Sequence, residues 1–248
     1  MSDSGQPNRD DKRLELFLSA PHPCNYLPDQ HTVNLVADPR ITINTPLYSA
    51  LVAQGFRRSG EFTYRPHCPR CKACVSMRLP VAEFHPRRSQ RRIRKRNQDV
   101  HLRAHPAEFN PAHFELYRRY VNTRHPDGGM DNPEQEDFLR FLTAAQIDTT
   151  FYELRDADSL LGVAVVDRLR DGLSAVYTFF DPDQPQRSLG VLAILLLIDE
   201  VKRLDRQYLY LGYWIGGCDK MNYKTEYQPA EGFIDSSWTR LPGPQKLR

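Results

Sequence analysis

Apolar and polar residues alternate in recognisable periods along the second half of the chain. Three runs rich in β-branched and aromatic residues, at 149–154, 160–169 and 173–180, are joined by the short polar stretches "RDADS" and "RDG". Such runs with short connections predict antiparallel β-hairpins. Residues 188–205, "SLGVLAILLLIDEVKRLD", are apolar on most sides early on, which predicts a buried helix. The stretch 207–215, "QYLYLGYWI", predicts a further strand.

Two amphipathic helices are expected ahead of these hairpins. In 110–124, Phe114, Tyr117 and Val121 are spaced i, i+3, i+7, as on one face of a helix. The segment 132–146 starts with an Asn that can cap a helix, then a proline and several acids that suit the positive helix end. A short strand is expected at 99–103.

From residue 99 the expected order is strand, two helices, three strands, buried helix, strand. This order resembles the acyltransferase fold named for the GNAT N-acetyltransferases, whose defining helix normally cradles the pyrophosphate of acyl-CoA. The matching site, "QRSLGVLA" at 186–193, carries Arg187 and Gly190 of the usual signal, but Leu192 stands where a small residue is usual. A helix amino terminus still attracts anions through its free N–H groups and dipole. We therefore predict an α+β protein with a GNAT-like core, a mixed sheet flanked by helices.

The first half is less regular and richer in proline. Strand-like runs occur at 14–20, 31–38 and 61–66, and 45–55 has the Thr, Pro and Gly signals of a short helix. These features predict a smaller amino-terminal α/β subdomain that contains the cysteines. The expected divisions are a tail at 1–12, the subdomain at 13–86, a basic segment at 87–97, a GNAT-like transfer domain at 98–240 and a tail at 241–248.

Composition narrows the class of protein. With 248 residues, 40% hydrophobic and 26% charged, the chain can bury a sizeable core and is not of disordered composition. Its start is polar, without a secretory hydrophobic region. The longest aliphatic run, Val191–Ile198, is far shorter than the roughly 20 residues of a membrane span. We expect a soluble cytoplasmic protein without a membrane partner.

Positive charge is concentrated in one place. Residues 87–96 hold seven Arg or Lys, whereas the formal net charge of the whole chain is only +3, so the rest of the chain is mildly acidic. If this segment is helical, Arg88, Arg91, Arg92 and Lys95 share one face. Seven like charges repel one another, and a nucleic-acid backbone relieves that repulsion. We predict a surface that contacts a nucleic-acid phosphate backbone; the alternative is an ordinary solvated helix.

Three of the five cysteines lie close together in "HCPRCKAC". Cys68, Cys71 and Cys74 have a spacing that suits a zinc ion or an iron–sulfur cluster. The fourth ligand would be Cys24, with His22 and His67 as the next candidates. Packed free thiols and a redox-sensing role are the alternatives.

Two further sets of residues with basic side chains are candidates for anion binding. Lys220, Tyr223 and Lys224 fall on one face if 220–224 is helical, and that face would bind an anion or be solvated. Arg57, Arg58 and Arg78 lie beside apolar residues, where surface arginine is the common alternative.

Several motifs together resemble one family. The stretches "PCNYLP", "GFRRSG", "YRPHCPRC", "RSQRR", "TFFDPDQPQRSLG" and "YLYLGYWIGGCDKMNYK" are similar to those of the bacterial aspartate/glutamate leucyltransferases, which belong with the arginyl-tRNA–protein transferases. The similarity runs from about Leu14 to Trp238. It implies transfer of leucine from leucyl-tRNA to proteins that begin with Asp or Glu, which marks them for degradation in the N-end rule pathway. The family is also known for a GNAT-like core.

One departure concerns the cysteines. Eukaryotic arginyl relatives carry a Cys-x-x-Cys pair near the amino terminus, and this chain matches its first position with Cys24 but has Leu27 at the second. A cluster site therefore does not carry over intact. The transfer itself requires no cofactor, and a zinc ion or cluster would be an addition.

The implied chemistry assigns roles to individual residues. The donor is an activated ester, so the enzyme must mainly align the reactants and stabilise an oxyanion. We expect Asp181 to orient or deprotonate the acceptor amine, Tyr177 to share its cleft and Ser188 to help hold an adenosine phosphate or the oxyanion. Lys220, Tyr223 and Lys224 would approach the tRNA 3′ end. Arg78, then Arg57 and Arg58, would bind the acceptor carboxylate, because Arg can hold both its oxygens.

Three other functions are consistent with parts of the sequence. An arginyl-tRNA–protein transferase differs only in the donor. An acyl-CoA-dependent N-acetyltransferase has the same fold but no need for the basic segment. A non-catalytic, zinc-containing RNA-binding module would not need the acyltransferase core. DNA is not an expected partner.

Overall fold

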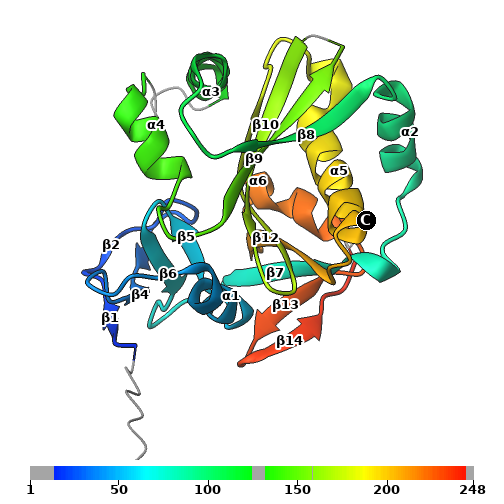
Figure 1. The fold of residues 1–248 in the computed structure, drawn as a ribbon. Helices are drawn as coiled ribbons and strands as arrows, with labels where there is room; N and C mark the ends of the chain where they lie inside the picture. Colours follow the sequence, from blue (N-terminus) through cyan, green and yellow to red (C-terminus); the bar gives the residue numbers. More distant parts are fainter. Residues whose placement is uncertain (1–13, 125–131, 158, 244–248) are drawn as a thin grey trace, which may run out of the picture.

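The structure is a computed structural model that describes residues 14–124, 132–157 and 159–243 (Figure 1). The tail expected at 1–12 and most of the tail expected at 241–248 lie outside the described residues. The strands are β1 (Leu16–Leu18), β2 (His22–Pro23), β3 (His31–Thr32), β4 (Asn34–Ala37), β5 (Arg57–Ser59), β6 (Phe62–Pro66), β7 (Cys74–Pro80), β8 (Val100–Pro106), β9 (Thr149–Asp156), β10 (Ser159–Arg168), β11 (Gly172–Phe180), β12 (Tyr208–Ile215), β13 (Glu231–Ile234) and β14 (Ser237–Arg240).

The helices are α1 (Thr45–Ala53), α2 (Arg88–Arg96), α3 (Pro111–Arg124), α4 (Gln135–Leu142), α5 (Leu189–Arg203) and α6 (Asp219–Asn222), with short 3-10 turns η1 (Val81–Glu83), η2 (Pro185–Arg187) and η3 (Tyr223–Glu226). Among the described residues, no helix is both long and apolar enough to cross a bilayer. The fold is a mixed α and β structure, as expected from the order of patterns.

A mixed sheet of eight strands forms the centre of the molecule, in the order β14-β13-β7-β12-β11-β10-β9-β8. The hairpins predicted from the three apolar runs are confirmed, since β9, β10 and β11 pair antiparallel. Alternate residues of β10 enter different cores: Val163 and Val165 pack toward α3 and α4, whereas Ala164 and Val166 pack toward α5. Helices α5 and α2 thus lie on one face and α3 and α4 on the other (Figure 1).

The predicted buried helix is confirmed as α5, with eight buried residues that include Leu192, Leu195 and Ile198. Its long apolar surface faces the sheet, and α2 packs along its outer side. Because α5 connects the parallel strands β11 and β12, it spans the middle of the sheet. The helix amino terminus, with Ser188 before it, therefore lies where β11 ends.

Two predicted helix ends differ from the structure. Helix α1 is capped by Asn44, whose side chain accepts from the Leu47 amide at 3.1 Å, and Thr45 is already its first helical residue. The segment 132–146 forms only α4, because its chain is extended at Glu134 and again at Thr143. Helices at 110–124 and in the basic segment are confirmed as α3 and α2.

The amino-terminal region builds a four-stranded sheet, β1-β4-β6-β5, with the two-stranded pair β2-β3 beside it. The expected subdomain 13–86 does not end where this small sheet ends, because β7 lies within the eight-stranded sheet between β12 and β13. The reason is apolar alternation: Met77 and Leu79 of β7 are fully buried against the α5 side. The small sheet therefore joins the large one through this strand.

Candidate active site

Two neighbouring parallel strands separate in the middle of the large sheet, and we call the region between them the crevice. Strands β11 and β12 pair only at three positions, from Gly172–Tyr208 to Ser174–Tyr210, and then continue to Phe180 and Ile215. The strands approach most closely at Gly172, where a Cβ would lie 2.0 Å from the Tyr208 carbonyl oxygen, so only glycine fits. A bulge between Tyr210 and Gly212 then bends β12.

Residues of β11 beside the crevice are more exposed than expected for a central strand. Ala175, Val176, Tyr177 and Thr178 are all partly exposed, although β11 has strands on both sides. The centroid of the Tyr177 ring lies 5.2 Å from that of Phe141 and 6.1 Å from that of Tyr117. The buried Tyr177 hydroxyl has no hydrogen-bond partner among the described residues. Burial, followed by the nearby tyrosines, raises the pKa of Tyr177, so its hydroxyl is a neutral donor at pH 7.

The structure places Asp181 directly after β11 but engages its carboxylate. Asp181 accepts from Arg119 of α3 at 2.8 Å, from the Asp183 amide at 3.2 Å and from the Gln184 side chain at 3.2 Å. These bonds fix the loop that leads into η2. Asp181 therefore has a loop-ordering role, which the sequence pattern did not indicate because Arg119 lies far away in the chain.

Ser188 precedes α5 with a left-handed backbone, φ 53°, and its side chain makes no capping bond. Arg187 does not point into the crevice, since its guanidinium pairs with Asp99 at 2.7 Å and with Asp156 at 3.1 Å. Phe180 lies over the first turn of α5, where its ring would be 3.0 Å from a Cβ at Gly190. An aromatic ring thus covers part of the first turn of α5.

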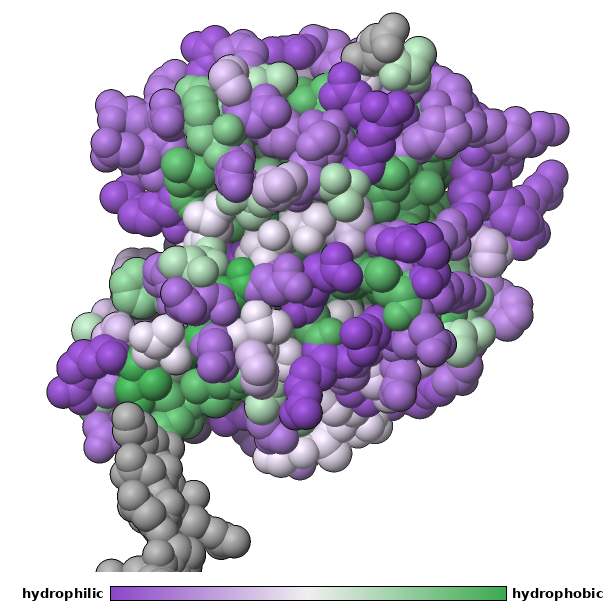
Figure 2. All heavy atoms as spheres, viewed as in Figure 1, coloured by the Kyte–Doolittle hydropathy of each residue, from purple (hydrophilic) through white to green (hydrophobic). Residues whose placement is uncertain are grey.

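The basic segment forms α2, and its four predicted contact residues are all exposed on the outer side: Arg88, Arg91, Arg92 and Lys95. Figure 2 shows this edge of the molecule, on the right of the view, as strongly hydrophilic. Arg94 instead turns inward and binds Asp199 of α5. The helix therefore presents unpaired positive charge outward while it is fastened to α5.

Two amides on the inner side of α2 were missed by the sequence analysis. Gln90 is buried and donates to the Glu226 carbonyl of η3 at 3.4 Å, and Asn97 is buried and donates to the Arg187 carbonyl of η2 at 3.0 Å. The two uncharged residues are seven positions apart, about two helical turns, and so lie on the same side of the helix. This spacing within a run of charges was the sequence signal for an inward-facing side. Through them α2 holds the two segments that flank the crevice.

The three candidate acceptor arginines differ in their partners. Arg78 donates to Glu231 at 2.8 Å and is stacked between Tyr208 and Trp238, whose ring centroids lie 3.7 Å and 4.4 Å from its guanidinium carbon. Arg58 forms a fully buried ion pair with Asp167. Both arginines therefore pair with acids of the protein itself, as expected of residues that stabilise the fold. Arg57 forms no ion pair with a described acid.

The predicted helical face at 220–224 is not formed. Helix α6 ends at Asn222 and a 3-10 turn follows, so Lys224 turns inward and donates to the Tyr213 carbonyl at 2.6 Å. Its exposed fraction is 7%, whereas Tyr223 is 44% exposed. Lys224 thus cannot contact tRNA as an exposed charge. The side chain of Lys220 lies outside the described part of the structure.

The four predicted metal-ligating cysteines line one cavity of about 850 Å³, together with His22 and His67. Burial, followed by repulsion from the thiolate forms of the neighbouring cysteines, raises the pKa of Cys74 to about 11. The pKa of Cys24 is lowered: burial opposes ionisation, but hydrogen bonds from the Tyr26 and Leu27 amides and Thr32 outweigh it.

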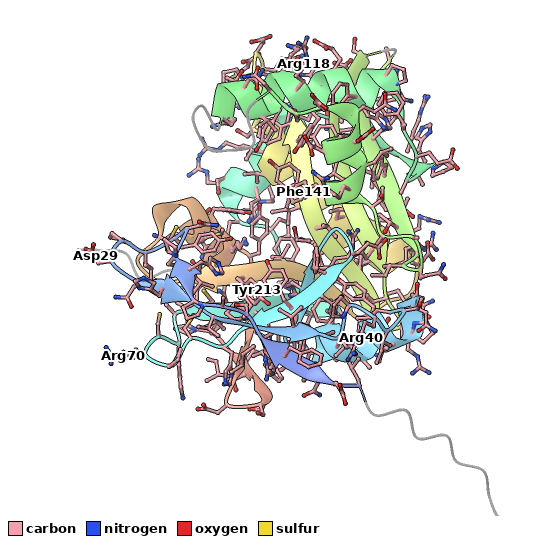
Figure 3. The ribbon with its side chains drawn as sticks, turned by 90° about the vertical axis from the view of Figure 1, so that its left-hand side faces the viewer. Asp29, Arg40, Arg70, Arg118, Phe141 and Tyr213 are labelled. Carbon is pink, nitrogen blue, oxygen red and sulfur yellow. The ribbon has the colours of Figure 1, made fainter. Side chains whose placement is uncertain are left out.

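The donor set fits a zinc ion or an iron–sulfur cluster by its chemistry. Within the described ranges, however, no three His, Cys, Asp or Glu side chains are grouped closely enough to hold a metal ion. Ligation would require the cysteines to approach one another. Tyr213, labelled near the middle of Figure 3, also lines this cavity, so its wall adjoins the strand that borders the crevice.

Comparison with known proteins places the chain. Residues 22–92 match the family model "Arginine-tRNA-protein transferase, N terminus" and residues 112–234 match "Arginine-tRNA-protein transferase, C terminus". The aspartate/glutamate leucyltransferase of Nitrosococcus oceani is 51% identical over 92% of this chain and 96% of that protein. The aspartate/glutamate leucyltransferase of Pseudomonas aeruginosa is 49% identical over 92% of this chain and 97% of that protein.

Among solved structures, the C-terminal domain of a putative lysylphosphatidylglycerol synthetase from Agrobacterium fabrum superimposes with a TM-score of 0.43 and 10% identity, covering 62% of this chain and 50% of that one. These values are too low to support a conclusion about fold or function. The sequence relatives and the two family models, by contrast, span most of the chain. The chain belongs to the arginine-tRNA–protein transferase family, together with the aspartate/glutamate leucyltransferases that it matches over nearly its whole length.

Proposed function

We propose that this chain transfers leucine from leucyl-tRNA to the amino-terminal Asp or Glu of acceptor proteins and so marks them for degradation in the N-end rule pathway. The observation that carries the proposal is the 51% identity to an aspartate/glutamate leucyltransferase over 92% of the chain. Both substrates, charged tRNA and the amino termini of acceptor proteins, occur in the cytoplasm. The reaction would take place there, without a membrane or DNA partner.

The central sheet with α5 serves as a GNAT-like acyl-transfer core in this proposal. Its support is the pair of parallel strands β11 and β12, joined by α5 and separated after three paired positions. The separated strands leave a crevice in which an acceptor amine can approach an ester carbonyl. The α-amine has a pKa of about 7.7–8.0, so a useful fraction is already neutral near pH 7 and no strong base is needed.

Binding of the tRNA backbone is assigned to the outer side of α2, where Arg88, Arg91, Arg92 and Lys95 are exposed. Tyr223, the exposed first residue of η3, would contact the tRNA 3′ end. Gln90 and Asn97 fasten α2 to both flanks of the crevice. A tRNA bound to α2 would therefore be held at a fixed position relative to the site of transfer.

Within the crevice, we assign stabilisation of the tetrahedral oxyanion to the Tyr177 hydroxyl, a buried donor without a partner. The first amides of α5, after Ser188, are a second source of donors, because a helix leaves its first N–H groups unpaired. Asp181 then acts indirectly: its bonds to Arg119 and Gln184 hold the loop between β11 and α5. Proton removal from the amine is left to water.

The four cysteines Cys24, Cys68, Cys71 and Cys74 would hold a zinc ion or an iron–sulfur cluster, which would tie two amino-terminal segments together, the one at Cys24 and the one at 68–74. No step of the transfer depends on it. Elemental analysis of anaerobically purified protein should find about one zinc ion or one cluster per chain. Fully stable and active protein without metal would contradict this assignment.

One assay tests the proposed function against its alternatives. The purified chain is incubated with a peptide that begins with Asp and with labelled leucyl-tRNA, arginyl-tRNA or acetyl-CoA in separate reactions. Transfer of leucine alone is the expected result. Transfer of arginine would indicate an arginyl-tRNA–protein transferase, and transfer of acetyl an N-acetyltransferase. Tight tRNA binding with no transfer would indicate a non-catalytic RNA-binding module.

A further inference from the structure

Two buried positive charges lie at the bulge of β12 without an acidic partner among the described residues. Arg57 of β5 is 5% exposed and Lys224 of η3 is 7% exposed. The other buried arginine among the described residues, Arg58, is neutralised by the Asp167 carboxylate. Burying a cation without a counter-charge costs free energy, so the arrangement needs an explanation.

Among the described residues, Arg57 hydrogen-bonds only to backbone carbonyl groups. Its Nη1 donates to Phe56 at 2.9 Å and its Nη2 to Met77 at 3.1 Å, while its buried Nε has no partner. The guanidinium carbon lies 5.4 Å from the centroid of the Tyr210 ring. These contacts fix the direction of the guanidinium but leave its positive charge uncompensated.

Lys224 is also held at β12 by a backbone carbonyl group. Its Nζ donates to the Tyr213 carbonyl at 2.6 Å, which uses one of the three donors of an ammonium group. Gly212, with φ 77°, has no side chain, and a Cβ there would meet only this Nζ, at 3.6 Å, within 4 Å. The Cβ position over Gly212 is therefore open except for the ammonium group that borders it.

The ladder between β7 and β12 brings the two cations together. Met77, whose carbonyl accepts from Arg57, is the pairing partner of Gly212, and paired residues of antiparallel strands lie about 4.5–5.5 Å apart. Burial, and after it the charge of Arg57, lowers the pKa of Lys224 to about 8. The two charges thus interact with each other across one pair of residues.

We propose that Arg57 and Lys224 form a carboxylate subsite at the β12 bulge, which receives the side chain of the acceptor's amino-terminal Asp or Glu. The inference rests on the proposed function and names the residues that read the acceptor. Two cations bind a carboxylate and reject the isosteric amide of Asn or Gln, which would leave the charges unpaired. Because the subsite lies in the crevice beside Gly212, a bound acceptor presents its amine near Tyr177.

The test uses two peptides that differ only in beginning with Asp or Asn. Both compete in one reaction for leucine from leucyl-tRNA, so the product ratio equals the ratio of their kcat/KM values. In wild type, transfer to neither peptide would overturn the proposed function and, with it, the acceptor role of the subsite. Equal transfer to both peptides would overturn the subsite and leave the function intact.

Arg57→Gln and Lys224→Gln keep a donor for the backbone carbonyls but remove the charge. Each should lower the Asp:Asn ratio by about 10²-fold while the Kd for leucyl-tRNA holds. Arg65→Gln and Lys202→Gln are the controls: Arg65 donates to the Gln54 carbonyl near the surface, and Lys202 is exposed. Neither control should change the ratio.

An unchanged ratio in both charge-removing variants would overturn the proposal. So would loss of leucyl-tRNA binding with an unchanged ratio, because the two cations would then serve the tRNA phosphates. If a variant does not fold, wild type alone decides: an Asp-Ala amide should raise its melting temperature more than an Asn-Ala amide. Equal effects of these dipeptides would overturn the subsite.

Discussion

Arg57 and Arg58 are neighbours on β5, are equally buried, and differ in what they meet. Arg58 donates to both oxygens of Asp167 at 2.7 Å, and to the Leu142 carbonyl and the Thr149 hydroxyl. Arg57 meets two carbonyl groups and a second cation, Lys224. Since adjacent strand residues point to opposite faces, one arginine enters a closed core and the other the crevice side.

The difference shows that burial alone does not separate a structural cation from a functional one. A saturated charge such as Arg58 stabilises the folded state, because removing it leaves Asp167 buried and unpaired. An unsaturated pair such as Arg57 and Lys224 destabilises it until an anion binds. The four predictions below test this contrast, in decreasing order of expected free energy.

The largest effect is expected at the closed pair. Arg58→Met should lower the free energy of unfolding by about 3–5 kcal/mol, because the Asp167 carboxylate stays buried without its partner. Urea unfolding of the purified variant measures the loss. The double variant Arg58→Met/Asp167→Leu should recover most of it, since no charge is left behind. A loss below about 1 kcal/mol in the single variant would show that Asp167 finds another partner.

At the open pair the sign should reverse. Lys224→Met should stabilise the protein at pH 7 by about 1–3 kcal/mol, because it removes a buried charge and loses one hydrogen bond. The pKa of Lys224 is about 8 in the folded state and about 10.4 when unfolded, so the unfolded chain binds more protons between these values. Wild-type stability from this group therefore rises with pH through that window.

The advantage of Lys224→Met over wild type should accordingly shrink as the pH rises from about 8 to about 10. Melting temperatures of both proteins across this range provide the measurement. Lys202→Met, at an exposed lysine, should show no such trend. If Lys224→Met is less stable than wild type at pH 7, the ammonium group contributes to the fold as Arg58 does, and the contrast fails.

Acceptor selectivity should depend on pH for the same reason. As the pH rises through about 8, Lys224 loses its charge and the Asp:Asn ratio of kcat/KM should fall by up to about tenfold, equivalent to about 1.4 kcal/mol. Such a ratio reports ionisation of the free enzyme, and the shared α-amine ionisation cancels between the peptides. Competition reactions at pH 7 and 9 measure it. Lys224→Gln should give a flat ratio; a flat ratio in wild type would contradict the prediction.

The exposed cations of α2 complete the series. Changing Arg88, Arg91, Arg92 and Lys95 to Glu should alter stability by less than about 0.5 kcal/mol, because these side chains are solvated. The salt dependence of tRNA binding should flatten, by about 0.9 in the log–log slope for each lost phosphate contact. Filter binding at several salt concentrations measures the slope. The control reverses four exposed cations elsewhere: Arg70, Lys72, Arg103 and Lys202.

Local patterns predicted the hairpins, the buried helix α5 and the exposed face of α2, because each depends on a periodicity contained in a short segment. Ion pairing could not be predicted in this way. Arg58 and Asp167 are separated by 109 positions, and Arg78 and Glu231 by 153. The strand-like stretch around Arg78 favours it over Arg57 for the acceptor role, and no nearby residue in the sequence reveals Glu231 as its partner.

Lys224 was misplaced for a different reason. The spacing of Lys220, Tyr223 and Lys224 suits a continuous helix, but α6 ends at Asn222 and the tighter turn of η3 rotates Lys224 into the protein. The separation of β11 and β12 also left no signal, since apolar residues continue in both strands beyond the point where they separate. Only the three-dimensional pairing reveals that β12 leaves its neighbour.

That separation makes a strand at the centre of the sheet behave in part like an edge. β11 pairs with β10 as far as Phe180, but with β12 only up to Ser174. Beyond Ser174, amides directed at β10 should resist hydrogen exchange, while alternate amides directed at the crevice should exchange with water. An extended peptide could complete these bonds on arrival. The acceptor's own backbone would then be recognised by the sheet, independently of its sequence, and its first side chain alone would decide acceptance.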